Sequence, residues 1–87
     1  MSVELSQDAV ALELNEFLQV ALRQPVQVED DIFATGMANS MFALELVVYM
    51  EERYDLTLES EDLNRDNFRS ARAMSQLVTR RAAAKDS

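Results

Sequence analysis

The sequence has no cysteine and no histidine, and it has only one glycine and one proline among its 87 residues. Without cysteine, neither a disulfide framework nor a thiolate metal site can form. Without histidine, the commonest general base and the commonest metal ligand are missing, so we expect no metal site. One glycine and one proline supply little material for hairpin turns, which disfavours an all-β fold.

Long apolar runs are also missing. No stretch reaches the roughly 18 apolar residues of a membrane-spanning helix. The first residues, Met1 to Leu5, lack a basic region followed by an apolar stretch, so no signal peptide is expected and a cytoplasmic location is predicted. The apolar content of 48% is typical of a globular chain, and we expect one domain over residues 1–87 with flexible ends at 1–5 and 84–87.

The net charge of −8 is unevenly distributed along the chain. Residues 1–64 hold fourteen acidic and two basic side chains, a balance of −12, whereas residues 65–87 hold six basic and two acidic, a balance of +4. An acidic body repels nucleic-acid phosphates and anionic lipid, and it attracts basic protein surfaces. We therefore expect protein partners, with no nucleic acid and no membrane. The alternative is that the charge only keeps the surface solvated.

Helical periodicity dominates the first part of the chain. A helix is expected from the N-cap Ser6 to about Arg23, ended by Pro25. Its predicted apolar face consists of Val10, Leu14, Phe17, Leu18, Ala21 and Leu22, with Glu13 pointing away. A long loop over residues 26–38 follows, and Phe33 is its expected anchor on the core.

A second helix is expected from Ser40 to about Arg53, with Asn39 as its N-cap. Its predicted core stripe is Ala43, Leu46, Val47, Met50 and Tyr54. Another side combines apolar residues with carboxylates: Met41, Leu44, Glu45, Val48, Glu51 and Glu52. Since a helix with three glutamates is unsuited to full burial in so small a chain, this side is predicted to contact a partner.

The C-terminal part is expected to add one short helical turn and a third long helix. Ser60 is the predicted cap of a turn over residues 60–63, and residues 56–59 are too isolated to pair as a strand. Residues 64–69 are expected to form a link anchored by Phe68. The last helix is predicted from the cap Ser70 to about Ala83. Its expected inward face is Ala73, Met74 and Leu77, with Val78 at the margin. The whole is an all-α bundle of three main helices plus one short helix.

Ser40 is the candidate functional residue. At the start of a helix, its hydroxyl lies where the helix dipole stabilises a phosphate group. As a nucleophile it would need a base, but histidine is absent and the only lysine, Lys85, lies in the tail. The spacing from Gly36 to Ser40 also does not match a nucleophile elbow. We therefore predict a phosphate ester on Ser40 and no enzymatic activity. The alternative is a serine that only starts a helix.

The stretch from Asp31 to Met41, followed by Glu45-Leu46-Val47 and Glu51-Glu52-Arg53-Tyr54, resembles the core signature of the acyl carrier proteins. In that family a loop ending in Gly-x-Asp-Ser-Leu precedes the second helix, and the serine carries a 4′-phosphopantetheine arm from coenzyme A. The resemblance implies that Ser40 holds this arm, whose thiol bears an acyl or aminoacyl thioester. It also implies a carrier that is not itself catalytic.

The resemblance implies partners as well: a phosphopantetheinyl transferase and enzymes that load and modify the acyl group. The second helix corresponds to the family's recognition helix, which makes charged contacts at Glu45, Glu51 and Glu52 and apolar ones at Met41, Leu44 and Val48. Phe42 either adds a flanking patch with Tyr49 or packs under the loop. Asn39 stands where the family usually has aspartate, which removes one negative charge beside Ser40.

The run from Asn39 to Val47, together with Asp66-Asn67-Phe68-Arg69-Ser70, resembles a narrower group. These are free-standing carriers on which hydroxymalonyl, methoxymalonyl or aminomalonyl extender units for polyketides are built. The resemblance implies a discrete, monomeric carrier in antibiotic biosynthesis, served by dehydrogenases, a methyltransferase and a polyketide synthase acyltransferase. An aminoacyl carrier, in nonribosomal peptide synthesis or D-alanyl transfer, is the alternative, and an unmodified acidic adaptor is a second one. The sequence leaves open which group is carried and what the basic C-terminal segment does.

Overall fold

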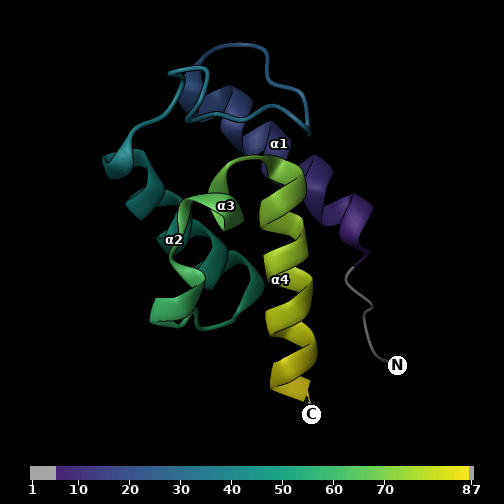
Figure 1. Ribbon diagram of the computed structural model, residues 1–87. Helices are drawn as coiled ribbons and strands as arrows, with labels where there is room; N and C mark the ends of the chain where they lie inside the picture. Colours follow the sequence, from purple (N-terminus) through teal and green to yellow (C-terminus); the bar gives the residue numbers. More distant parts are fainter. Residues whose placement is uncertain (1–5, 87) are drawn as a thin grey trace.

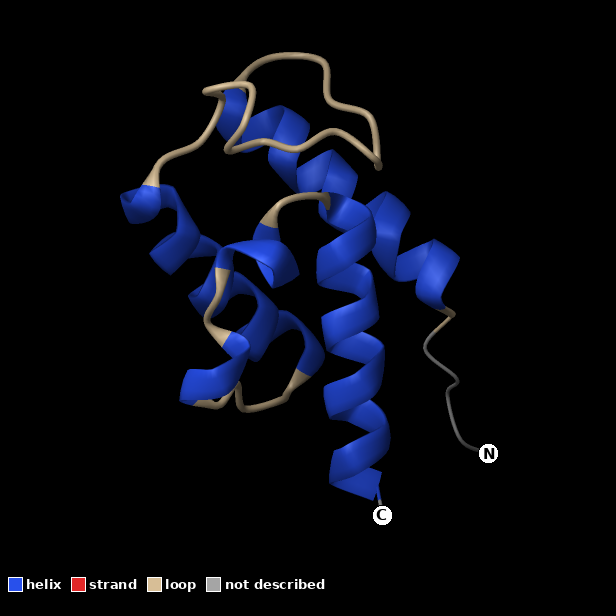
Figure 2. Cartoon of the chain, in the orientation of Figure 1, coloured by secondary structure: helices blue, strands red, loops and turns tan. Residues whose placement is uncertain are grey.

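A computed structural model describes residues 6–86, and within that range all the regular structure is helical (Figure 2). The elements are α1 (Gln7–Leu22), α2 (Ser40–Tyr54), the 3₁₀ turn η1 (Ser60–Asp62), α3 (Arg65–Phe68) and α4 (Ala71–Asp86). The predicted all-α bundle with three main helices is confirmed. It contains two short helical elements where the sequence predicted one.

Helix α4 is the centre of the packing, with α1, α2 and α3 all against it (Figure 1). Leu14 and Leu18 of α1 and Leu77 of α4 are fully buried, as predicted. Val78, predicted at the margin, is also fully buried. The prediction was wrong because α4 is covered from more than one side, whereas a single amphipathic stripe assumes one covered face.

Helix α1 begins as predicted, with the Ser6 hydroxyl accepting a hydrogen bond from the Ala9 amide. It ends at Leu22, because Arg23 adopts a left-handed conformation with φ 56° before Pro25 is reached. Ala21 was expected on the core face but is exposed, since it lies in the last turn, where the chain leaves the helix at Arg23.

The loop between α1 and α2 is anchored by Ile32 and Val26, whose exposed fractions are 0% and 3%. The prediction that Phe33 is the anchor was wrong, because Phe33 is only half-buried. Ile32 is held inward at the backbone. Its amide donates to the carbonyl of Arg69 (2.7 Å), and its carbonyl accepts from the Ala38 amide (2.9 Å). Phe33 is left at the edge of the core.

The turn η1 is capped differently from the prediction. Ser60 lies inside the turn, and Glu59 is the residue that precedes it. The Asp62 carboxylate accepts from the Glu59 amide at 2.8 Å, which closes the turn. Leu56 and Leu58, in the preceding segment, are buried, and no strand is formed among the described residues.

Residues 64–69 were predicted to form an irregular link, but they contain the short helix α3. Asn64 caps this helix, because its side-chain oxygen accepts from the Asn67 amide at 3.0 Å. Phe68, predicted as the anchor of this segment, is buried with 4% exposure. The capping asparagine was the local signal that would have identified the helix.

Two arginines of the C-terminal part, Arg72 and Arg81, pair with the acidic body of the protein. Arg72 donates to Asp8 (2.8 Å) and Glu29 (3.2 Å), which joins α4 to α1 and to the loop. Arg81 binds the Asp62 carboxylate, which joins α4 to η1. Part of the charge asymmetry of the sequence therefore serves ion pairs within the molecule, at Arg72 and Arg81.

Helix α4 continues to Asp86, beyond its predicted end near Ala83. The predicted flexibility of both ends stays a prediction. Residues 1–5 and 87 lie outside the described residues, and residues 84–86 belong to α4. Between residues 6 and 86 there is no helix with the length and apolar character needed to cross a bilayer. In the same range, no three or more carboxylates are grouped so that they hold a metal ion.

Candidate functional site

Ser40 is the first residue of α2, and its side chain is exposed. Asn39 caps the helix as predicted: its Oδ1 accepts from the Phe42 amide at 3.0 Å, and its carbonyl accepts from the Ala43 amide at 3.1 Å. The amides of Ser40 and Met41 have no acceptor within the helix, so they are free to face an anion at its positive end. Within residues 6–86 the Ser40 hydroxyl makes no hydrogen bond.

A tight turn before α2 presents Ser40 at the surface. The Asp31 carboxylate accepts from the amides of Ala34 (2.9 Å) and Phe33 (3.0 Å). The hydrogen bond from Ala34 is the main reason why the pKa of Asp31 lies below its ordinary value. Gly36, the only glycine, has φ 80°, a conformation that side chains disfavour, and its amide donates to the Phe33 carbonyl. This turn directs the chain back toward the start of α2.

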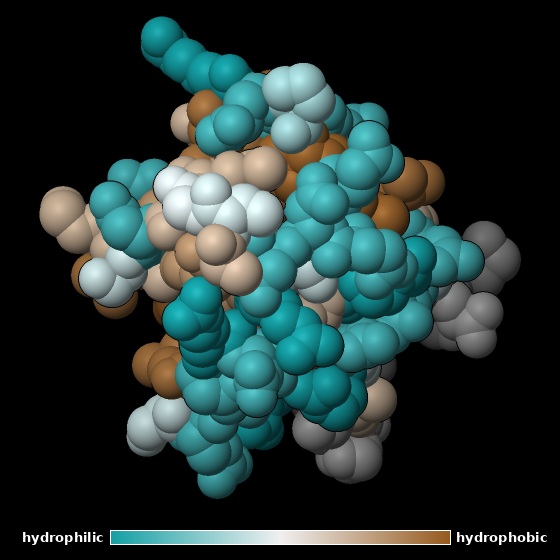
Figure 3. Space-filling model, turned by 45° about the horizontal axis from the view of Figure 1, so that its top comes forward, coloured by the Kyte–Doolittle hydropathy of each residue, from teal (hydrophilic) through white to brown (hydrophobic). Residues whose placement is uncertain are grey.

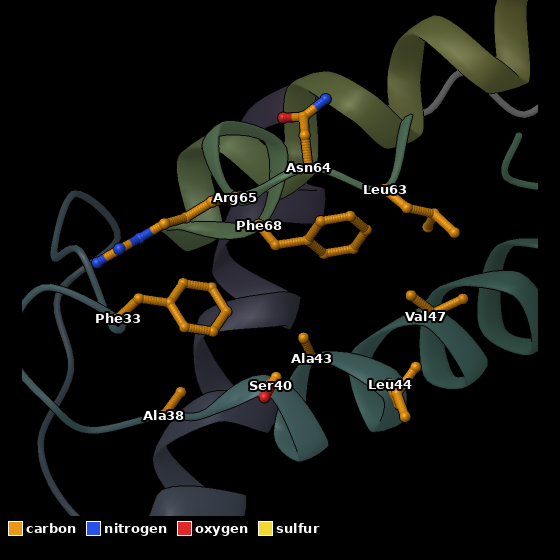
Figure 4. Close-up of a pocket in the computed structure, with 10 residues that line it drawn as sticks. All are labelled: Phe33, Ala38, Ser40, Ala43, Leu44, Val47, Leu63, Asn64, Arg65 and Phe68. Atoms are coloured by element: carbon orange, nitrogen blue, oxygen red, sulfur yellow. The ribbon is translucent and has the colours of Figure 1, made fainter. Parts of the chain in front are cut away.

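A pocket of about 500 Å³ opens beside Ser40. It lies between α2, the loop and the segment from Leu63 to Phe68 (Figure 4). The rings of Phe33 and Phe68 project into the space over Ser40 and Val47 of α2. Most of the lining is apolar, and Arg65 is its only charged residue in the described part of the chain. The volume lies within the roughly 300–1,000 Å³ of small-molecule sites.

The outer side of α2 is solvent-facing, as the sequence predicted. Met41, Leu44 and Val48 have exposed fractions of 76%, 67% and 53%. Glu45 and Glu52 are exposed on the same helix. We call these five residues the α2 face. Figure 3 shows from one direction that hydrophobic surface on this molecule forms separate patches within a mostly hydrophilic exterior. Contact of the α2 face with a partner stays a prediction.

Leu63 also lines the pocket beside Ser40, although the sequence did not indicate this role. It is 51% exposed and faces Val47 across the pocket (Figure 4). It was missed because it follows a short turn and has no periodic apolar partners around it.

Glu51, predicted as a partner contact, is partly buried and already bonded within the chain. Its Oε2 accepts from the Leu58 amide at 2.9 Å, and its carbonyl accepts from the Leu56 amide at 3.2 Å. The side chain therefore holds the segment that leaves α2. The helical wheel could not reveal this, since the bonded amide lies outside the helix.

Phe42 packs against α1. The Phe17 ring stacks on Tyr49 with centroids 4.0 Å apart and lies 6.4 Å from the Phe42 ring at a similar tilt. All three rings are half-buried. Phe42 packs inward, as one of its two predicted roles required, but it packs against a ring of α1 and not under the loop. The other predicted role, an exposed patch with Tyr49, is not observed.

A cluster at the other end of α2 ties it to α1. Glu13, which was predicted to point away from the core, accepts hydrogen bonds from the Tyr54 hydroxyl and from Arg53 (2.6 Å). The Tyr54 bond lowers the pKa of Glu13, while burial raises the pKa of Tyr54. These contacts hold one side of α2 against α1, so the α2 face is turned outward.

Comparison with known proteins adds a limited similarity. Over 52 residues the chain is 31% identical to the D-alanyl carrier protein of Streptococcus sanguinis strain SK36 and to that of Streptococcus gordonii strain Challis. It is 29% identical to that of Streptococcus mutans serotype c over the same length. Each match covers 60% of this chain and 66% of the relative, just under two thirds of the relative's own length. No family model matches, and neither does any solved structure. The chain is thus similar to carrier proteins, which do not themselves catalyse reactions.

Proposed function

We propose that this chain is a carrier protein modified at Ser40 with 4′-phosphopantetheine from coenzyme A. The observation that carries the proposal is the exposed Ser40 hydroxyl at the capped start of α2, beside an apolar pocket. The similarity to D-alanyl carrier proteins supports the same role.

The residues around Ser40 fit such a group. The amides of Ser40 and Met41 are placed to stabilise a phosphate at the positive end of α2, and Asn39 holds that helix start in place. In the modification, Ser40 Oγ forms a bond to the phosphorus that carries pantetheine. The hydroxyl proton passes to the transferase, and adenosine 3′,5′-bisphosphate leaves. The attached arm supplies a thiol that holds the cargo as a thioester.

The α2 face is the proposed docking surface for the transferase and for the enzymes that load the cargo. Glu45 and Glu52 supply negative charge for a basic partner surface, and Met41, Leu44 and Val48 supply apolar area. An exposed ion pair contributes roughly 0.2–1 kcal/mol, so these contacts suit brief encounters with several enzymes in turn.

Two classes of cargo each have an observation in their favour. The name of the relatives favours an aminoacyl group, since they are D-alanyl carrier proteins. The resemblance of residues 39–47 to extender-unit carriers favours a functionalised malonyl group for polyketide biosynthesis. The two classes differ in charge, because an aminoacyl thioester ends in an ammonium and a malonyl thioester in a carboxylate.

Intact mass spectrometry tests the proposal. The chain is incubated with coenzyme A and a promiscuous phosphopantetheinyl transferase, and we expect one phosphopantetheine adduct. Ser40→Ala should remain helical by circular dichroism and receive no adduct. Ser60→Ala, which alters another exposed serine at a helical start, is the matched control and should be modified normally. Absence of the adduct on the wild-type chain, or its presence on Ser40→Ala, would refute the carrier role.

A further inference from the structure

Arg65 differs from the other arginines of the C-terminal part. Arg69, Arg72 and Arg81 are in ion pairs, and Arg80 donates to the side chain of Asn67. Arg65 has no ion pair and no hydrogen bond from its guanidinium within residues 6–86. Its contact is with the Phe33 ring, whose centroid lies 5.8 Å from the guanidinium carbon. The donors of Arg65 therefore have no acceptor in the described part of the chain.

Arg65 also belongs to the pocket beside Ser40. In Figure 4 its side chain extends from α3 toward the loop, away from Leu63 and Val47, so the guanidinium lies at the edge of the pocket beside Phe33. The Asp31 carboxylate is near enough for the charge of Arg65 to help lower its pKa. That carboxylate is already bonded to the amides of Phe33 and Ala34, and it forms no ion pair with Arg65. The positive charge remains open to another anion.

We propose that Arg65 is a specificity-determining residue that favours cargo ending in a carboxylate. The inference rests on the proposed function, because the cargo reaches the pocket from an arm on Ser40. An acyl group in the pocket meets apolar walls, and one cation at the edge beside the loop. A carboxylate gains a charge-assisted hydrogen bond there, a neutral acyl group gains only apolar contact, and an ammonium is repelled. Between the two cargo classes, this charge favours a malonyl-type group over an aminoacyl group.

The test compares cargoes on the same chain. The arm is attached with no cargo, or with stable amide-linked malonyl, acetyl or D-alanyl groups, and each product is checked by intact mass. Amide chemical shifts of the pocket residues Ala43, Val47 and Phe68 then report how far the cargo docks. We expect the malonyl form to show the largest changes relative to the unloaded arm. Arg65→Gln should lower the docked-to-free ratio of the malonyl group about two- to fivefold, which is the effect of one exposed ion pair.

Arg69→Gln is the matched control. Arg69 is close in sequence and exposed, but it pairs with Asp66 and does not line the pocket. This variant should leave the malonyl shifts unchanged, and neither variant should alter the acetyl shifts. A second readout is the pKa of a ¹³C-labelled malonyl carboxyl, which should be lower on the wild-type chain than on Arg65→Gln.

The outcomes separate this inference from the proposed function. If no arm can be attached to Ser40, the carrier role itself fails. If the arm is attached but malonyl shifts are equal in the wild type and Arg65→Gln, only the selectivity fails. Stronger docking by D-alanyl than by malonyl would also overturn it. If Arg65→Gln perturbs the unloaded arm as much as the malonyl form, Arg65 binds the phosphate and not the cargo, which refutes the proposal.

Discussion

Replacing Asp62 with asparagine should loosen the segment that carries one wall of the pocket. Asp62 is only 7% exposed. Its Oδ2 accepts from Arg81 Nε (2.6 Å) and from the Glu59 amide (2.8 Å), and its Oδ1 accepts from Arg81 Nη2 (2.9 Å). An asparagine keeps one acceptor but places an NH₂ donor at the other position, against existing donors. Hydrogen bonds to charged groups contribute roughly 1.5–3 kcal/mol to stability, and partial solvation reduces this contribution. We therefore expect Asp62→Asn to lower the free energy of unfolding by about 2 kcal/mol.

Thermal and urea unfolding followed by circular dichroism measure this loss. For a domain of this size, about 1 kcal/mol corresponds to about 4–8 °C in Tm, so Asp62→Asn should lower Tm by about 8–16 °C. The hydrogen bonds from Arg81 hold the pKa of Asp62 below its ordinary value of 3.8. A carboxyl with a lowered folded-state pKa stabilises the protein above its unfolded pKa, and this contribution is lost as pH falls through the folded pKa. The difference in the free energy of unfolding between wild type and Asp62→Asn should therefore be complete at neutral pH and shrink below about pH 4.

Glu61→Gln is the control for this prediction. Its carboxylate lies 3.4 Å from the same Arg81, but it is 80% exposed. The change in unfolding free energy should stay within about 0.5 kcal/mol. The reasoning is refuted if Asp62→Asn costs no more than Glu61→Gln, or if its deficit persists undiminished in strong acid.

Two further changes test the start and the outer face of α2. Asn39→Asp keeps the cap and adds a negative charge at the helix start, so unfolding should show a gain of about 0.3–1 kcal/mol and mass spectrometry a faster modification of Ser40. Asn39→Ala should lower the free energy of unfolding by about 1 kcal/mol. Identical unfolding curves for Asn39→Asp and Asn39→Ala would contradict the capping role. Glu45→Lys with Glu52→Lys should slow modification at low salt without loss of helicity, and salt should reduce the difference. Glu51 is left unchanged because it bonds the Leu58 amide, and equal rates at low salt would count against the α2 face.

The sequence alone was sufficient for the starts of α1 and α2. Ser6 and Asn39 cap α1 and α2 as predicted, because a cap bonds an amide only a few residues away. The exposed character of Met41 and Leu44 followed from the period of the helix. The same local pattern singled out Ser40, and its modification stays a prediction. These features depend on neighbours that are close along the chain.

The tertiary structure decided what depends on distant neighbours. Ile32, and not Phe33, became the loop anchor because its amide bonds the carbonyl of Arg69 in another part of the chain. The sequence left the role of the basic C-terminal segment open, and in the structure its Arg81 binds Asp62 of η1. The pocket exists because the loop, α2 and α3 converge, which places Arg65 and Ser40 in the lining of one pocket. A periodic pattern specifies the faces of one helix, but it contains no information on which segment covers them.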